Sequence, residues 1–319
     1  IEAVTGVQTC ALPIFLKNLF QLKSKKINLM ITGATGCGKS STINALFDTE
    51  VAKVGVGVDP ETMDISKYEL DNLILWDSPG LGDGKEADNR HAKNIIKKLA
   101  EVDENGDALI DLVLVTLDGS TKDLGTSYEL INTIIIPNLG KNKEGRILVA
   151  INQADVAMKG RYWDYEKNEP QKTLKEFLDK KVISVKERIK EGTGINIEPI
   201  YYSAGFKEDG QLQTKPYNLS KLLYFIIKAT PKEKRLAYVD TINPNDEMWK
   251  DNDDIKDYGK EIQNSFAETV KDCATTGSDI GERIGEVFGE SGKRIGRVAG
   301  GIIGGVVGVG KAIWHGIFG

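Results

Sequence analysis

The sequence has few cysteines, few histidines and no block of lysine and arginine. Three cysteines in 319 residues are too few for a disulfide framework or a zinc site. The net charge of −5, from 42 basic and 47 acidic side chains, gives no general attraction to nucleic acid. We therefore expect no DNA partner. The composition, with 40% apolar residues, predicts a globular cytoplasmic protein with a sizeable core.

The sequence also lacks a long apolar span and a secretion signal. The uncharged run at 298–310 has 13 residues, about 20 Å of helix against a hydrocarbon core of about 30 Å. Residues 1–14 have neither the charged start nor the cleavage site of a signal peptide. They contain T-G-V-Q-T-C-A-L-P-I, which resembles a translated sequencing adapter, and the chain begins without Met. We interpret 1–14 as an assembly artefact.

What the sequence does have is a glycine-rich loop closed by lysine and serine. Residues 33–40 read G-A-T-G-C-G-K-S, after an apolar run and before helical spacing, as the P-loop pattern requires. Backbone N–H groups of such a loop surround phosphates. We expect Lys39 to bridge the β- and γ-phosphates and Ser40 to ligate Mg²⁺. The predicted phosphate-binding residues are Gly33, Ala34, Thr35, Gly36, Cys37, Gly38, Lys39, Ser40 and Ser41.

Three later motifs indicate which nucleotide is held. In D-S-P-G, Asp77 can hold a Mg²⁺-bound water and the Gly80 N–H can read the γ-phosphate. In N-Q-A-D, the carboxylate of Asp155 can pair with two guanine N–H groups. Adenine offers neither, which would cost about 1–3 kcal/mol or more. In S-A-G, a backbone N–H can reach guanine O6. The predicted base-binding residues are Asn152, Gln153, Asp155, Ser203 and Ala204.

These four motifs, in this order, resemble those of the translation-factor-like GTPases, in particular the Era-like branch. The resemblance covers about residues 25–230, and the core is also similar to prophage-encoded GTPases of unassigned role. The stretch N-L-I-L-W-D-S-P-G-L-G resembles the immunity-related GTPases. The resemblance implies binding of GTP and GDP and hydrolysis of GTP.

Two positions depart from the usual GTPase pattern. Gln153 stands where a lysine is usual, which either lowers guanine affinity or is tolerated because glutamine also has an aliphatic stem. Leu81 stands where Ras-like enzymes carry the glutamine that orients the attacking water. We therefore expect slow intrinsic hydrolysis. The expected catalytic residues are Lys39, Thr62 and Gly80. The expected Mg²⁺ ligands are Ser40, Thr62 and Asp77. Thr62 belongs to the first switch segment, which we expect over residues 51–64.

Apolar runs that alternate with helical patterns predict an α/β fold with a mostly parallel sheet covered by helices on both faces. Ligands of such sheets lie beyond the carboxyl ends of the strands. By composition we place a G domain at 15–240, a polar acidic helical or linker segment at 241–276 and a glycine-rich tail at 277–319. The residues 118–121 after one strand are interpreted as a loop, with a dimer contact as the alternative.

The glycine-rich tail reads as an amphipathic helix with separate apolar, glycine and charged faces. Six glycines oppose such a helix by about 1 kcal/mol each, so it needs a surface to pack against. We expect 277–319 to meet a membrane surface, peripherally at the inner face, or a second copy of the chain. The alternatives are a tail folded back on the G domain or disordered, an Era-like factor on ribosomes or RNA, and a scaffold that binds GTP without hydrolysis. The absence of a basic patch disfavours RNA.

Overall fold

The computed structural model describes residues 21–22, 24–47, 53–56, 65–206 and 214–271. The predictions for residues 1–14, for Thr62 and for the tail at 277–319 fall outside these ranges. Within them, no helix is both long and apolar enough to cross a membrane.

The described strands form a seven-stranded sheet and a separate two-stranded one, and the larger sheet is mostly parallel, as predicted. Five of its strands, β4, β1, β5, β6 and β9, pair in parallel. At one edge, β3 pairs antiparallel with both β4 and β2. The order in the sheet is β2 (Lys53–Val56), β3 (Ser66–Leu70), β4 (Leu73–Asp77), β1 (Ile27–Gly33), β5 (Leu112–Asp118), β6 (Ile147–Asn152) and β9 (Ile200–Tyr201). Asp71 and Asn72 turn the predicted β3–β4 hairpin.

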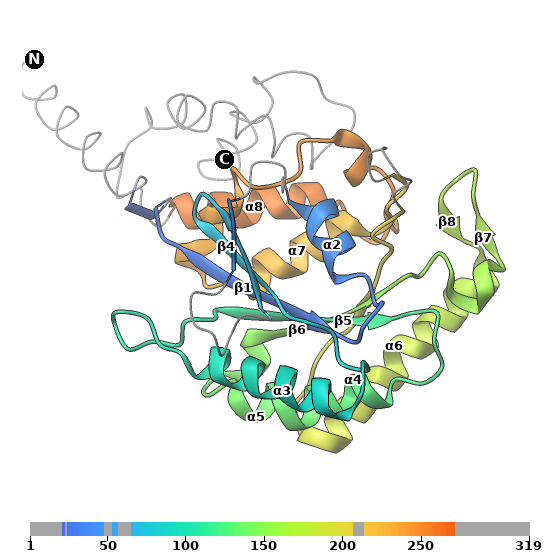
Figure 1. Cartoon of the computed structure of the whole chain (residues 1–319). Helices are drawn as coiled ribbons and strands as arrows, with labels where there is room; N and C mark the ends of the chain where they lie inside the picture. The colour runs from blue at the N-terminus through green and yellow to red at the C-terminus, as the bar shows by residue number, and fades with distance from the viewer. Residues whose placement is uncertain (1–20, 23, 48–52, 57–64, 207–213, 272–319) are drawn as a thin grey trace, which may run out of the picture.

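The central strands are apolar throughout because helices cover both faces of the sheet. Every residue of β1 is buried, and its side chains alternate between two apolar layers, with Leu29 in one and Met30 in the other. One layer is covered by α2 (Lys39–Leu46), α7 (Leu219–Ala229) and α8 (Tyr258–Lys271). The other is covered by α3 (Lys85–Ala100), α6 (Lys172–Thr193) and the α4–α5 region (Figure 1).

The sequence over about 124–136 has a helical pattern that predicts a single helix, and the structure divides this stretch into three pieces. These are α4 (Gly125–Glu129), a π-helical stretch η3 (Leu130–Ile135) and α5 (Ile136–Asn138). Pro137 lies in the first turn of α5 and has no N–H to continue the regular hydrogen-bond ladder. Apolar spacing predicts helical winding here, but it does not distinguish α-helical from π-helical winding.

Residues beyond 231 pack into the same core as the sheet. The short helices η6 (Lys232–Tyr238) and η7 (Asp246–Trp249) lead to α8, which lies against α7. Tyr238 and Phe266 are fully buried in the layer that contains α2 and α7. Figure 1 shows α8 on the same side of the sheet as these two helices. The composition of the sequence changes near residue 240, where we placed a boundary. In the structure, the residues before and after this position pack into one core.

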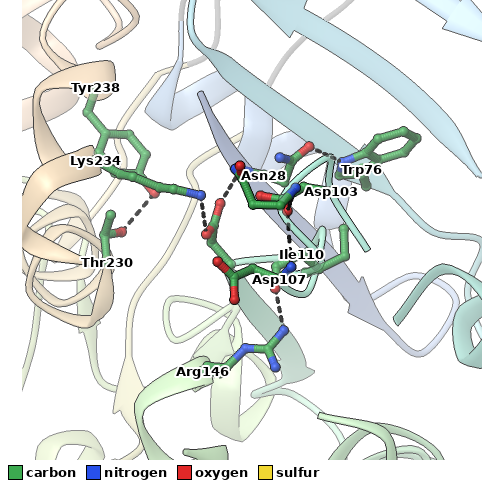
Figure 2. Close-up of polar contacts among 11 residues, drawn as sticks. Asn28, Trp76, Asp103, Asp107, Ile110, Arg146, Thr230, Lys234 and Tyr238 are labelled. Atoms are coloured by element: carbon green, nitrogen blue, oxygen red, sulfur yellow. Dashed lines mark hydrogen bonds and ion pairs between the residues drawn. The ribbon is translucent and has the colours of Figure 1, made fainter. Parts of the chain in front are cut away.

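A buried polar network at the amino end of the sheet holds this later segment in place. The Asp111 carboxylate, just before β5, accepts from the Lys234 ammonium at 2.6 Å and from the backbone N–H of Asn28 at 2.9 Å. The Asn28 side chain accepts in turn from Trp76 at 3.0 Å. Figure 2 shows Lys234, Asn28 and Trp76 meeting here, with Arg146 donating to the Ile110 carbonyl nearby. Burial raises the pKa of Asp111, and the Lys234 ammonium opposes that rise.

We expect Lys234→Met to lower the free energy of unfolding by about 3 kcal/mol at neutral pH, because it leaves a buried carboxylate without its cation. Loss of the ammonium raises the pKa of Asp111 further, so the penalty shrinks as the pH falls and the carboxyl becomes neutral. Urea unfolding at neutral and mildly acidic pH measures both effects.

The matched control is Lys250→Met, which removes the exposed ion pair with Glu247 from the same part of the chain. The side chains of Lys250 and Glu247 are 47% and 64% exposed, against 23% and 8% for Lys234 and Asp111. We expect this control to cost less than about 0.5 kcal/mol. Equal effects of the two substitutions would contradict the assigned role of Lys234.

Candidate nucleotide-binding site

The glycine-rich loop lies between the end of β1 at Gly33 and the start of α2 at Lys39. Gly36 and Gly38 have φ of 80° and 86°, in the left-handed region that favours glycine. A Cβ on Gly38 would also collide with the side-chain amide of Asn152. The local chain thus has the form of a phosphate-binding turn that feeds a helix N-terminus.

Lys39 reaches back over this loop from the first position of α2. Its ammonium donates to the carbonyl oxygens of Gly33 at 3.4 Å and Ala34 at 3.2 Å. The charge therefore lies over the turn whose amides would surround a phosphate. Phosphate oxygens are stronger acceptors for an ammonium than neutral carbonyls, so Lys39 is placed to exchange these partners for a nucleotide.

Ser40 and Asp77 meet beside the loop. Because β4 pairs in parallel with β1, Asp77 is opposite Ile31 and its Oδ2 accepts from Ser40 Oγ at 3.3 Å. Its other oxygen, Oδ1, is buried with no hydrogen-bond partner among the described residues. Burial raises the pKa of Asp77, and the Lys39 charge and the Ser40 hydrogen bond oppose this rise.

This donor set fits Mg²⁺. The ion prefers oxygen ligands and is commonly bound by one or two protein groups together with nucleotide phosphates and water. A hydroxyl and a buried carboxylate oxygen without a partner are such groups. Thr62, the other predicted ligand, lies outside the described residues. In the part of the chain that is described, no cluster of three or more His, Cys, Asp and Glu residues offers a different metal site.

The D-S-P-G segment packs directly on the phosphate loop. The Thr35 N–H donates to the Leu81 carbonyl at 2.9 Å, and the Leu81 N–H donates to the Gly33 carbonyl at 3.4 Å. Gly80 touches Thr35 so closely that any Cβ would collide with it. The Leu81 side chain is only 4% exposed and belongs to the apolar core, so it serves packing where Ras-like enzymes have a water-orienting glutamine.

Asp88 holds the segment after D-S-P-G, a role that the sequence analysis does not predict. Its Oδ1 accepts from the backbone N–H groups of Gly82 at 2.8 Å and Asp83 at 3.2 Å, just before α3 begins at Lys85. A carboxylate in the first turns of a helix suits the positive end of the helix dipole. The signal in the sequence was an aspartate a few residues after two glycines.

Asn152 joins three of the four motifs. Its side chain is buried, and its Nδ2 donates to the Cys37 carbonyl of the phosphate loop at 3.0 Å. Its Oδ1 accepts from the Ala204 N–H of the S-A-G segment at 2.9 Å. Both the donor and the acceptor of this side-chain amide are thus paired with backbone groups. These bonds join residues 152–155, which we call the base-recognition turn, to the phosphate loop and to S-A-G.

Gln153 and Asp155 follow on the same turn. Gln153, with φ of 62°, donates from Nε2 to the Gly36 carbonyl at 2.8 Å, so glutamine contacts the phosphate loop where a lysine is usual. Asp155 is partly exposed, and no hydrogen bond or ion pair joins it to another described residue. Its carboxylate therefore has capacity for a ligand, as the predicted guanine contact requires.

The S-A-G segment is braced by the chain that returns toward α7. Ser203 and Tyr217 exchange two backbone hydrogen bonds of 2.9 Å, and the Gly205 N–H donates to Ser203 Oγ at 3.1 Å. The Ala204 N–H is occupied by Asn152. Contact of this segment with guanine O6 stays a prediction.

Cys37 is not a nucleophile. The thiol is buried inside the phosphate loop, and burial raises its pKa to about 11, with a small opposing effect from Lys39. It is neutral at physiological pH and contributes packing. Ser41 follows in the first turn of α2, and Thr42 beside it joins this helix to Tyr202 through a buried contact of 2.6 Å between hydroxyls.

The structure therefore brings those predicted residues that it describes, all except Thr62, to one place, the carboxyl edge of the parallel sheet. The phosphate loop, the end of β4 and the ends of β6 and β9 all open there, as expected for ligand sites of such sheets. Contacts between these residues and a nucleotide stay predictions. The fold and the arrangement of these residues have the form of an α/β P-loop domain.

Comparison with known proteins agrees with this class. Residues 28–153 match the family model described as 50S ribosome-binding GTPase. The match contains the phosphate loop, Asp77 and the start of N-Q-A-D, and ends before Asp155. It does not distinguish the Era-like branch within this class.

Two curated relatives match over shorter stretches. A translocase of chloroplast 125 from Physcomitrium patens is 33% identical over 112 residues, which are 33% of this chain and 9% of that protein. Interferon-inducible GTPase 1 from Mus musculus is 37% identical over 70 residues, 20% of this chain and 17% of that protein. The chain thus spans less than a fifth of either. The second match agrees with the resemblance to immunity-related GTPases.

Among solved structures, Toc33 from Arabidopsis thaliana in complex with GDP and Mg²⁺ is 17% identical, with a TM-score of 0.42. The alignment covers 75% of this chain and 96% of that one.

Proposed function

We propose that this protein binds GTP, hydrolyses it to GDP and phosphate, and acts as a molecular switch. The observation that carries the proposal is the buried Asn152 amide, which ties the base-recognition turn to the phosphate loop. A nucleotide that lies over Lys39 then has its base beside Asp155. The matched family model, which consists of GTPases, supports the same activity.

The preference for guanine rests on Asp155. A carboxylate accepts two hydrogen bonds from guanine, at N1–H and the 2-amino group, whereas adenine presents no donor at either position. The partly exposed Asp155 carboxylate has no hydrogen-bond or ion-pair partner among the described residues, so guanine can supply both donors. A site built to pair with substrate N–H groups rejects analogues that lack them much more strongly than a shape-selective pocket does.

The phosphate groups are assigned to the loop and to D-S-P-G. Lys39 would stabilise negative charge that develops on the γ-phosphate, and the Gly80 N–H would donate to the same group. Mg²⁺, which Ser40 and Asp77 would hold, supplies further neutralisation of phosphate charge when bound. In hydrolysis a water oxygen attacks the γ-phosphorus, the bond to the β–γ bridging oxygen breaks, and GDP leaves with that electron pair.

Hydrolysis is proposed to be slow in the isolated protein. Leu81 is packed in the core and carries no group that could hold a water. Positioning of the attacking water must therefore come from the backbone, from the first switch segment or from a partner. We further propose that the protein belongs to the Era-like subgroup. We propose that it is cytoplasmic and peripheral at the inner face of a membrane, and that residues 277–319 bind lipid or a second copy of the chain.

A ribosome-associated GTPase is the second candidate, favoured by the description of the matched family. The net charge of −5 disfavours this candidate, because the sequence has no block of basic residues to bind an RNA phosphate backbone. A scaffold that binds GTP without hydrolysis is the third. Phosphate release separates the third candidate from the first, and co-sedimentation separates the first from the second.

We expect the purified full chain to release phosphate from GTP at a rate on the order of 10⁻³ per second, because the site has charge stabilisation without a water-orienting side chain. EDTA, and separately Lys39→Ala, should abolish the release. Turnover of many per second without a partner would contradict the inferred role of Leu81. Release no faster than that of Lys39→Ala would favour the scaffold.

We expect the full chain to co-sediment with vesicles that contain anionic lipid, because the proposed amphipathic segment combines an apolar face with basic residues. A chain that ends at residue 276 retains all the core residues described above and serves as the control. It should stay in the supernatant with both GDP and a non-hydrolysable GTP analogue. Full-length protein that ignores vesicles but sediments with ribosomes would replace the membrane proposal with the second candidate.

A further inference from the structure

Lys181, in the middle of α6, points its ammonium into a cage of carbonyl oxygens. It donates to the carbonyls of Asp118 at 3.2 Å, Gly119 at 2.7 Å and Thr121 at 2.6 Å. These three acceptors lie about 60 residues earlier in the chain, in the loop that follows β5. Burial lowers the pKa of Lys181, and the nearby Asp118 carboxylate opposes that effect.

The loop that Lys181 holds lies against the base-recognition turn. Because β5 pairs in parallel with β6, Asp118 is opposite Asn152. The Gly119 N–H donates to the Asn152 carbonyl at 2.7 Å, and a Cβ on Gly119 would collide with that same oxygen. The two backbones are therefore hydrogen-bonded and in close contact at this point.

Among the described residues, Lys181 makes the side-chain hydrogen bonds that join α6 to this loop. Within it, Asp118 Oδ1 accepts from the N–H and the hydroxyl of Ser120, which are contacts internal to the loop. The Lys181 ammonium binds three of its carbonyls at once from outside. Removal of that ammonium leaves these carbonyls without their cationic donor and takes away the hydrogen bonds that hold the loop to α6.

We propose that Lys181 is a positioning residue for guanine recognition. It fixes the 118–121 loop, the loop fixes the backbone at Asn152, and Asn152 fixes the turn that carries Asp155. This inference rests on the proposed guanine specificity. It assigns to Lys181, which lies outside all four motifs, a role in maintaining that specificity. Lys181 contacts no predicted nucleotide-binding residue itself, so its effect on the base is indirect.

The proposal separates base recognition from phosphate binding. The predicted phosphate contacts come from the phosphate loop and from D-S-P-G, which Lys181 does not contact. Loss of Lys181 should therefore weaken the base contact more than the phosphate contacts. IDP reports this difference, because its base lacks the 2-amino group that pairs with Asp155 and its diphosphate is the same as that of GDP.

The test compares the dissociation constants of GDP and IDP, by titration calorimetry, for the full-length protein and for Lys181→Met and Lys180→Met. Lys180 is the adjacent residue on α6 and is exposed. In Lys181→Met we expect the preference for GDP over IDP to fall about fivefold or more. In Lys180→Met the preference should stay as in the parent.

An unchanged GDP preference in Lys181→Met, or an equal loss of affinity for both nucleotides, would overturn the positioning role. The ratio is independent of the fraction of protein that is folded, so a merely destabilised variant would not mimic the expected result. If the unmodified protein itself shows no preference for GDP, the proposed guanine specificity fails first. Should Lys181→Met not fold, Lys181→Gln retains two uncharged donors and carries the same test.

Discussion

The buried amide of Asn152 is the constraint on which the other parts of the site depend. With one donor on the Cys37 carbonyl and one acceptor for the Ala204 N–H, it sets the distance between the phosphate loop and both base-binding segments. Buried polar groups of this kind are costly unless every hydrogen bond is made. Both partners are backbone groups, so their position is set by the strands that precede them. The sheet thereby determines the spacing of the site.

The sequence predicted the fold because buried strands and helices leave local patterns, and the predicted phosphate-binding residues rest on a pattern of the same local kind. Buried strands such as β1 read as apolar runs, and the phosphate loop has a fixed spacing of glycines, Lys39 and Ser40. Contacts between distant segments leave no such pattern. The bond from Lys181 to the loop after β5, and the role of Asp88, depend on side chains that are ordinary polar residues in their own sequence neighbourhood.

The polar segment after residue 240 illustrates the same limit. Its composition suggested a separate region, yet apolar side chains of this segment such as Ile242, Ile262 and Phe266 are fully buried. Asn243 donates to the carbonyls of Leu46 at 3.0 Å and Asn44 at 2.9 Å, at the end of the helix that begins with Lys39. Helix ends need such acceptors satisfied. The segment therefore contributes to the same core as the sheet and is bonded to the end of α2.

The central claim is that a nucleoside triphosphate lies over Lys39 while Asp155 selects its base. Titration calorimetry of GTP, ATP and XTP with Mg²⁺, on the full chain and on Asp155→Asn, tests it most directly. The account predicts that the parent binds GTP about a hundredfold or more tighter than ATP. It also predicts that Asp155→Asn shifts the preference toward XTP, whose 2-oxo group accepts from an amide. Equal affinities for GTP and ATP in the parent, or an unaltered preference in Asp155→Asn, would contradict it.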